Sequence, residues 1–218
     1  MRVNRTQAEE NRRAVIDAAS RLFRERGFDG VGLAELMGAA GLTHGAFYKQ
    51  FKNKDDLIAQ ACDRALETGA LGWRRAAVDA GEGAYAALVR RYLTPGHRGR
   101  VGAGCVFAAL GPDAARHGPD LPRHFEAGVK TFVGILGDAM RKANPEATAD
   151  DALAAFATMV GALMLARAVG DEAYARRILV AATARLLDKG IPCSPRASPI
   201  ASAATACITA GSSPPSRS

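Results

Sequence analysis

The chain has 218 residues, which is enough for one or two compact domains, and 48% of them are apolar. Its formal net charge of +7 at pH 7 favours an anionic partner. Its four cysteines show no Cys-x-x-Cys motif and no framework spacing, which argues against a disulfide-stapled secreted domain. The composition is alanine-rich, as expected for a helical protein.

No segment suited to secretion or membrane insertion is predicted. The first 13 residues are polar throughout, unlike a secretory signal. The longest uncharged apolar run, residues 152–166, has 15 residues, whereas a membrane span needs roughly 20. We therefore expect a cytoplasmic protein with no membrane partner.

The N-terminal quarter predicts a basic module built on a helix. Residues 1–8 are expected to form a loosely ordered arm, read either as a solvated tail or as a contact to nucleic acid through Arg2 and Arg5. A helix over about 9–26 follows, and Gly27 is expected to end it. Its buried positions fall on one helical face; they are Val15, Ile16, Ala19, Leu22 and Phe23.

The segment 32–51 predicts two short helices joined by a tight turn. Leu33, Leu36, Met37 and Ala40 recur at helical spacing. Gly41 stands where a left-handed residue ends many helices. Thr43 is then placed to cap a second helix with its hydroxyl. Two interpretations stay open: an ordinary helical hairpin, or a helix-turn-helix whose second helix enters a DNA major groove.

The second helix would bury Phe47 and Phe51 and direct a polar face outward. Small residues on that face let a backbone approach bases, whereas tyrosine and lysine reach phosphates. Residues 1–54 hold ten Lys or Arg against six acids, which suits a phosphate-binding module. The candidate DNA-binding residues are Thr43, His44, Gly45, Ala46, Tyr48, Lys49, Lys52 and Lys54.

Lys54 is unusual because it stands in the first turn of a helix that begins near Asn53. Asp55 and Asp56 suit the positive end of a helix, but a lysine there needs another reason. A DNA phosphate would supply that reason; an unpaired surface lysine is the alternative.

The run GLTHGAFYKQFKNKDDLI, at residues 41–58, resembles the recognition helix and following segment of TetR/AcrR-type transcriptional regulators. The resemblance covers roughly residues 9–69. Gln50 stands where the family often has His or Tyr, and Gly32 replaces the usual Ser or Thr cap. The resemblance implies operator DNA as partner, a dimer, an effector pocket in the C-terminal body, and a phosphate contact for Lys54.

Further helices are expected along the body, separated by Gly and Pro breaks. The ranges are 53–78, 82–93 ended by Thr94-Pro95-Gly96, 105–110 closed by Gly111-Pro112, 119–143 ended by Asn144-Pro145, 148–169, and 171–189. A glycine-rich loop is expected over 97–104. The run 190–218 is rich in Ser, Pro and Ala, and is interpreted as a disordered tail.

The last two helices carry more apolar surface than one antiparallel pair can hide. A seam of Leu153, Phe156, Val160, Leu163 and Arg167 is expected to pack against another helix. A two-fold dimer through residues 148–189 would bury this surface, as in the resembled family. A monomer with both helices inside is the alternative.

An effector could bind within the body, since a pocket borrows core residues. The candidate walls, each equally readable as plain core, are Trp73, Tyr85, Leu88, Tyr92, Phe107, Phe125, Val129, Phe132 and Met159, and they suggest an apolar ligand. RVGAGCVFAAL resembles a subgroup in which a cysteine senses oxidants or electrophiles. Nearby Arg98 and Arg100 would lower the pKa of Cys105; a small buried hydrophobe is the alternative.

Enzyme and metal chemistry are not predicted. The four histidines are scattered, and no HExxH, GxSxG or P-loop occurs. The glycines at 99–104 follow no predicted strand, so they do not form a dinucleotide fingerprint. We expect an all-α regulator of about nine helices without cofactor or metal: a DNA-binding domain at 9–69, a ligand-binding and dimerisation domain at 70–189, and a nucleoid-associated, repressor-like function. A helical homodimeric interaction protein that has lost DNA binding is the alternative.

Overall fold

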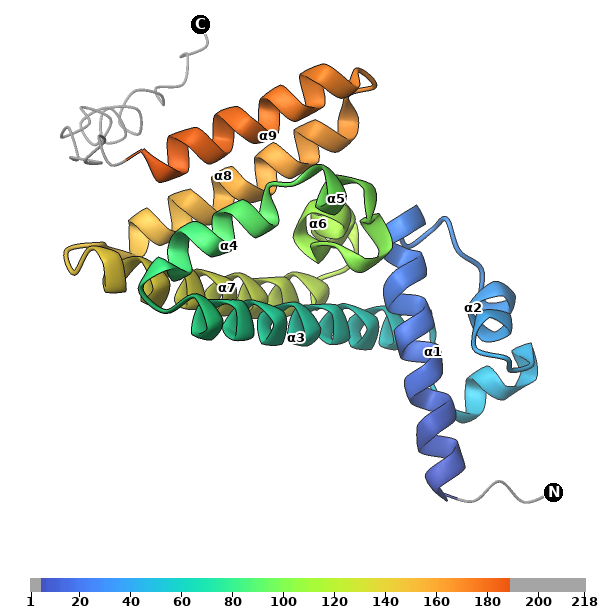
Figure 1. The fold of residues 1–218 in the computed structure, drawn as a ribbon. Helices are drawn as coiled ribbons and strands as arrows, with labels where there is room; N and C mark the ends of the chain where they lie inside the picture. The colour runs from blue at the N-terminus through green and yellow to red at the C-terminus, as the bar shows by residue number, and fades with distance from the viewer. Residues whose placement is uncertain (1–4, 189–218) are drawn as a thin grey trace, which may run out of the picture. The chain divides into compact units, whose positions relative to one another are not determined.

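The computed structural model describes residues 5–188. Arg2, Cys193, Cys207 and the expected disordered tail at 190–218 lie outside the described residues. Over 5–188 the chain forms nine α-helices and three short 3-10 helices without a strand, which confirms the all-α expectation (Figure 1). In chain order these are α1 (Arg5–Arg26), α2 (Leu33–Ala39), η1 (His44–Lys49), α3 (Lys54–Ala80), η2 (Gly81–Gly83), α4 (Ala84–Tyr92), α5 (Pro95–Gly99), η3 (Val101–Ala103), α6 (Val106–Arg116), α7 (Leu121–Ala143), α8 (Ala149–Ala168) and α9 (Glu172–Leu187).

Helix α1 is the support of the N-terminal region. It begins at Arg5, so the expectation of a loose arm is wrong for residues 5–8, where no Gly or Pro interrupts the helix. Gly27 ends α1 with φ of 76°. Phe28 then packs edge-to-face on Phe23, with ring centroids 5.6 Å apart. α2 and η1 pack on one side of α1 (Figure 1).

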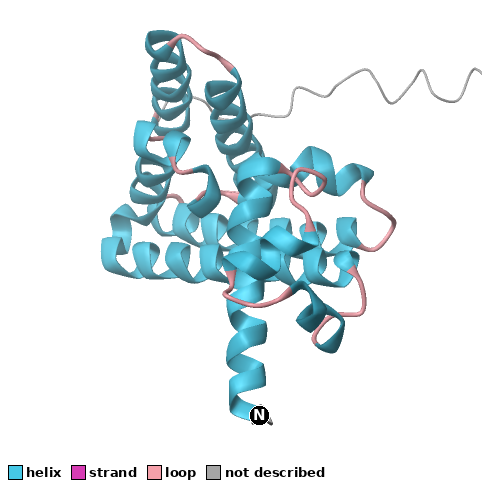
Figure 2. Cartoon of the chain, turned by 90° about the vertical axis from the view of Figure 1, so that its right-hand side faces the viewer, coloured by secondary structure: helices cyan, strands magenta, loops and turns pink. Residues whose placement is uncertain are grey.

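Helix α3 joins the N-terminal region to the body. Asn53 caps it as expected, its Oδ1 accepting from the backbone N–H of Asp56 at 2.8 Å. Farther along, α3 lies beside α7 (Figure 1). Figure 2 shows the described residues as helices joined by loops, without a strand. Two glycines allow the close packing of α3 and α7. A Cβ at Gly69 would lie 3.0 Å from the Phe132 ring, and one at Gly128 would lie 2.5 Å from Leu66.

One expected break in the body ends a helix and another does not. α4 ends at Tyr92, before Thr94-Pro95-Gly96, as expected. Pro95 opens α5, because proline suits the first turn of a helix, and Thr94 Oγ1 caps it by accepting from His97 N at 3.1 Å. The expected glycine-rich loop therefore contains α5 and η3. Pro112 lies inside α6, which continues to Arg116. Burial of Leu110 and Ala114 offsets the one backbone hydrogen bond that proline removes.

Helices α8 and α9 form an antiparallel pair whose bounds agree closely with the expected ranges 148–169 and 171–189. Thr148 and Asp151 make a capping box on α8, and Asp171 caps α9. The expected seam is buried only in part within the chain: Phe156 and Leu163 are buried, but Leu153 is 47% exposed. Seven residues of α8 are buried, and four of them are alanines: Ala152, Ala155, Phe156, Met159, Ala162, Leu163 and Ala166.

Among the described helices, α8 alone is long and apolar enough to cross a membrane, judged by length and composition. The mean hydropathy of its most apolar 18-residue stretch is 1.5, and 39% of that stretch is buried inside the protein. Because α8 packs Met159 and Leu163 fully into the core, this is weak evidence for a membrane segment.

Candidate nucleic-acid interface and effector cavity

The turn between α2 and η1 is set by Gly41. Its φ of 71° is left-handed, as the sequence suggested. The N–H of Gly41 donates to Gly38 O and that of Leu42 to Met37 O, both at 2.9 Å. These bonds satisfy the last carbonyls of α2 and redirect the chain within two residues.

The segment expected as a recognition helix is a six-residue 3-10 helix. Ala46 N donates to Thr43 O at 3.0 Å, the three-residue spacing of that geometry. Thr43 occupies the cap position, but its side chain makes no capping hydrogen bond, so the hydroxyl capping expectation is wrong. One short turn containing Gly45 gains too little from α-helical bonding to hold a regular α-helix.

The outward face of η1 and the loop after it carries the predicted residues. Tyr48 is 66% exposed, although its ring lies edge-on to the buried Phe47. Gly45 is exposed, and a Cβ added there would meet no atom within 4 Å. The fold itself therefore does not require glycine at 45. Thr43, His44, Lys49 and Lys52 are also exposed, whereas Ala46 and Lys54 are half-buried.

Arg12 fixes this segment from behind, and sequence reasoning missed it. Its guanidinium donates to the carbonyl of Gln50 and, at 2.6 Å, to Oε1 of Gln60. It also lies 4.7 Å from the centroid of the Phe51 ring. One half-buried side chain of α1 thus ties the end of η1 to α3, and no local sequence pattern signals that contact.

The lysines of this face have no acidic partner. Lys49, Lys52 and Lys54 form no ion pair with any residue of the described range 5–188. The nearby acids are engaged elsewhere: Asp55 contacts His117 at 3.1 Å, and Asp56 accepts from Lys52 N at 3.0 Å. Desolvation alone would raise the pKa of Asp56, but hydrogen bonds from Lys52 N and Gln60 lower it overall. The positive charge of the face is therefore available to an external anion.

A second candidate site is a cavity of about 820 Å³ in the body. It lies between α1, α3, α4 and the segment 94–105, and we call that segment the connector. The structure brings five of the predicted wall residues together there with the sensor candidate Cys105; the five are Trp73, Leu88, Tyr92, Phe107 and Phe132. Other predicted residues do not line it. The Tyr85 hydroxyl donates to Leu186 O at 2.9 Å, and Phe125 lies behind Phe107 with ring centroids 5.7 Å apart. Val129 and Met159 also lie outside the cavity wall.

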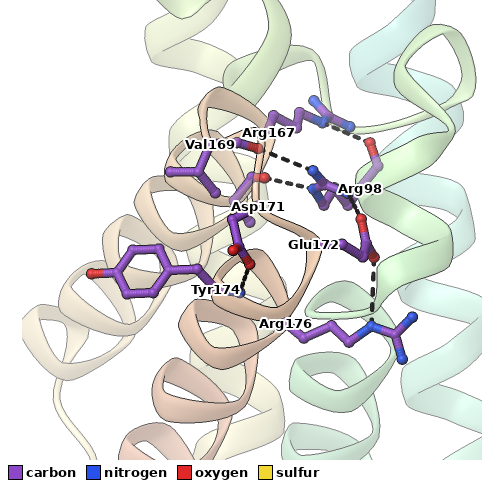
Figure 3. Close-up of polar contacts among 8 residues, drawn as sticks. Arg98, Arg167, Val169, Asp171, Glu172, Tyr174 and Arg176 are labelled. Atoms are coloured by element: carbon purple, nitrogen blue, oxygen red, sulfur yellow. Dashed lines mark hydrogen bonds and ion pairs between the residues drawn. The ribbon is translucent and has the colours of Figure 1, made fainter.

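The connector is bonded to helices on both sides. Arg98 donates to Ala166 O at 2.5 Å and Val169 O at 3.2 Å at the end of α8, and pairs with Glu172 of α9 at 2.5 Å (Figure 3). Arg167 donates back to the carbonyls of His97 and Arg98. On the opposite side, Arg24 of α1 donates to Gly102 O at 2.8 Å. The connector therefore links α1 to the α8–α9 pair.

The environment of Cys105 differs from expectation. Arg98 is bound to α8 and α9, and burial raises the pKa of the thiol above its ordinary value. Opposing effects of Tyr92, backbone N–H groups and Arg167 do not cancel that rise. The expected lowering of the pKa is therefore wrong. Cys105 as a whole residue is half-buried, and its N–H donates to His97 Nε2 at 3.0 Å.

Comparison with known proteins places the resemblance in the N-terminal region. Residues 15–61 match the profile of the bacterial regulatory proteins, tetR family. HTH-type transcriptional regulator AcrR of Shigella flexneri is 41% identical over 59 residues, which are 27% of each chain. HTH-type transcriptional repressor BepR of Brucella suis is 38% identical over 65 residues, 30% of this chain and 31% of BepR. The aligned stretch thus spans under a third of these relatives.

Solved structures extend the likeness to the whole fold. The reduced form of NemR from E. coli superposes with a TM-score of 0.69 over 81% of this chain and 95% of its own, at 19% identity. A TetR transcriptional regulator from Chloroflexus aurantiacus gives 0.68 over 83% and 94%, at 24% identity. At such identities the likeness concerns the fold alone.

Proposed function

We propose that this chain, which belongs to the tetR family of bacterial regulatory proteins through its N-terminal region, is a sequence-specific DNA-binding transcriptional regulator. In this proposal residues 9–69 bind DNA, and residues 70–189 bind an effector and dimerise. The protein works in the cytoplasm on operator DNA and is not an enzyme.

One observation carries the proposal: the unpaired lysines, the exposed Tyr48 and the open backbone at Gly45 share the face formed by η1 and the start of α3. Lysine and tyrosine side chains there can contact phosphates on both sides of a groove. The bare backbone at Gly45 lets η1 approach base edges, while Arg12 holds the segment rigid from behind. Thr43, His44 and Ala46 lie nearest to the bases in this arrangement.

A dimer supplies the second DNA contact. The outward side of α8 and α9 leaves apolar side chains in solvent, with Leu165 59% and Val180 67% exposed. Alanines and Gly161 between them permit close helix packing. A second copy placed on this face through a two-fold axis would form a four-helix bundle and present two recognition segments.

Effector control acts through the cavity and the connector. A ligand that binds better to one arrangement of α1 shifts the protein toward that arrangement, and the difference in affinity limits the shift. Because Gly102 of the connector is bonded to α1, a change in the cavity is transmitted to the helix that holds the DNA-binding face. A repressor role is supported by the name of the BepR relative.

DNase footprinting on DNA from beside the protein's own gene tests the proposal. We expect two protected half-sites whose centres lie about 34 Å apart, one turn of DNA, or a multiple of it. A chain that dimerises but protects no DNA at micromolar concentration would support the alternative, a helical interaction protein that has lost DNA binding.

A further inference from the structure

The cavity beside the connector combines an apolar floor with a cationic wall. Trp73, Leu88, Phe107 and Phe132 supply aromatic and aliphatic surface. About 820 Å³ is enough for a drug-sized molecule. A wholly apolar ligand, as the sequence suggested, would leave the polar part of this wall unused.

The charges on the wall are strongly unbalanced. Arg24, Arg64, Arg91 and Arg100 line the cavity, against the single carboxylate of Asp17. That carboxylate is already paired with Arg64 at 2.7 Å. The other three arginines have no ion pair with any residue between 5 and 188. Arg24 is half-buried, so it attracts an anion more strongly than an arginine in open water does, while Arg91 and Arg100 are exposed to solvent.

A buried hydroxyl on the same wall has only the Cys105 thiol, a weak hydrogen-bonding group, as its polar contact among the described residues. The Tyr92 side chain is 4% exposed, and its hydroxyl has no hydrogen-bond partner among the described oxygens and nitrogens. Its polar neighbours are the Cys105 thiol and the cation of Arg167, whose buried Nη1 is also unpartnered. A thiol satisfies a buried hydroxyl poorly, because sulfur is a weak hydrogen-bond acceptor. An oxygen atom of a ligand would accept from this hydroxyl more strongly than the thiol does.

We propose that this cavity binds an organic anion, in which a carboxylate, sulfonate or phosphate group is carried on an aromatic or aliphatic body. The anionic group faces the arginines and accepts a hydrogen bond from the Tyr92 hydroxyl. The body covers the floor formed by Trp73, Leu88, Phe107 and Phe132. The regulatory meaning of this site rests on the proposed function, but binding itself does not depend on DNA.

Trp73 makes the site directly observable, because it is the one tryptophan of the chain and lies on the floor. The probes are 8-anilinonaphthalene-1-sulfonate and the uncharged N-phenyl-1-naphthylamine, which share the ring system and differ by the sulfonate. Each is titrated into the full chain, with energy transfer from Trp73 as the signal. We expect saturable transfer to both probes.

Charge recognition is tested with an Arg91→Gln/Arg100→Gln variant, since both side chains are exposed and their loss leaves the core intact. We expect the affinity for the sulfonate probe to fall at least about tenfold and that for the neutral probe to stay within about twofold. Tyr92→Phe should also weaken the sulfonate probe selectively. Arg75→Gln, on an exposed α3 residue away from the cavity wall, should change neither affinity.

Equal losses for the two probes, unchanged sulfonate affinity in both variants, or no saturable transfer from Trp73 would overturn the proposal. Because these titrations contain no DNA, such a failure is separate from a failure of the footprinting experiment. If the sulfonate probe binds as expected, it should also alter the affinity for operator DNA by at least about threefold. Binding without that change would refute the cavity as the regulatory site, while leaving it an anion site.

Discussion

Two glycines of the DNA-binding region, Gly41 and Gly45, should respond oppositely to alanine. Gly41 has φ of 71°, so alanine there must adopt a left-handed conformation. This costs roughly 1–2 kcal/mol. Gly45 has no positive φ and open space where a Cβ would stand, so alanine should leave the free energy of unfolding within about 0.5 kcal/mol or raise it slightly.

DNA affinity should respond the other way round, because Gly45→Ala should directly weaken operator binding. A methyl group at 45 lies between the η1 backbone and the bases and forces the two apart. Overpacking of this kind costs roughly 1–3 kcal/mol, which is about a 5- to 150-fold loss of operator affinity. Gly41→Ala should lower the melting temperature by roughly 2–8 °C, whereas Gly45→Ala should leave it nearly unchanged.

Thermal circular dichroism at one fixed protein concentration and fluorescence anisotropy on the footprinted operator measure the two effects. The fixed concentration matters because the melting temperature of a dimer depends on it. A Gly45→Ala protein that melts normally and binds the operator with wild-type affinity would refute the close approach of η1 to DNA. A Gly45→Ala protein that unfolds would refute the claim that the fold tolerates a side chain there.

Three further outcomes are expected. Lys54→Ala should weaken binding to all DNA sequences alike and reduce the salt slope by about one unit per protomer, measured by anisotropy; an unchanged slope would remove Lys54 from the phosphate contacts. Val180→Glu should raise the dimer dissociation constant by about tenfold or more in sedimentation experiments, whereas Val78→Glu, on a valine of α3 that is 76% exposed, should not; equal effects would place the dimer elsewhere. Since burial raises the pKa of Cys105, little thiolate exists at pH 7, so alkylation of its peptide by N-ethylmaleimide should be slower than that of a free cysteine and accelerate as pH rises. Faster alkylation, with loss of operator binding in wild type but not in Cys105→Ser, would instead support the sensor prediction.

Short sequence patterns predicted the elements that are stabilised by contacts between residues close in sequence. The helix starting at Asn53 was predicted from its capping residue, and those starting at Thr148 and Asp171 were predicted from Pro and Gly breaks before them. In the structure all three residues cap their helices. The turn at Gly41 was found because glycine alone adopts its backbone conformation without strain. Breaks were less reliable, since Pro112 stays inside a helix that the core holds in place.

The sequence predicted the apolar residues of the cavity and the exposed residues of the DNA-binding face, but not the arginines that contact them. Arg12, Arg24 and Arg167 each act on a partner 38 or more residues away, so no helical period or short motif reveals them. Arg98 was expected beside the thiol because it is close in sequence, yet it folds onto α8 and α9. The cationic wall of the cavity therefore became visible only once distant segments were placed together.

The salt dependence of operator affinity tests the central claim most directly. Three lysines per protomer, Lys49, Lys52 and Lys54, give six candidate phosphate contacts in a dimer. Each phosphate contact contributes a slope of about −0.9 to the logarithm of affinity against the logarithm of salt. Anisotropy titrations should therefore give a slope of about −5. A slope near zero, or affinity absent at low salt, would show that the face formed by η1 and the start of α3 does not lie on DNA.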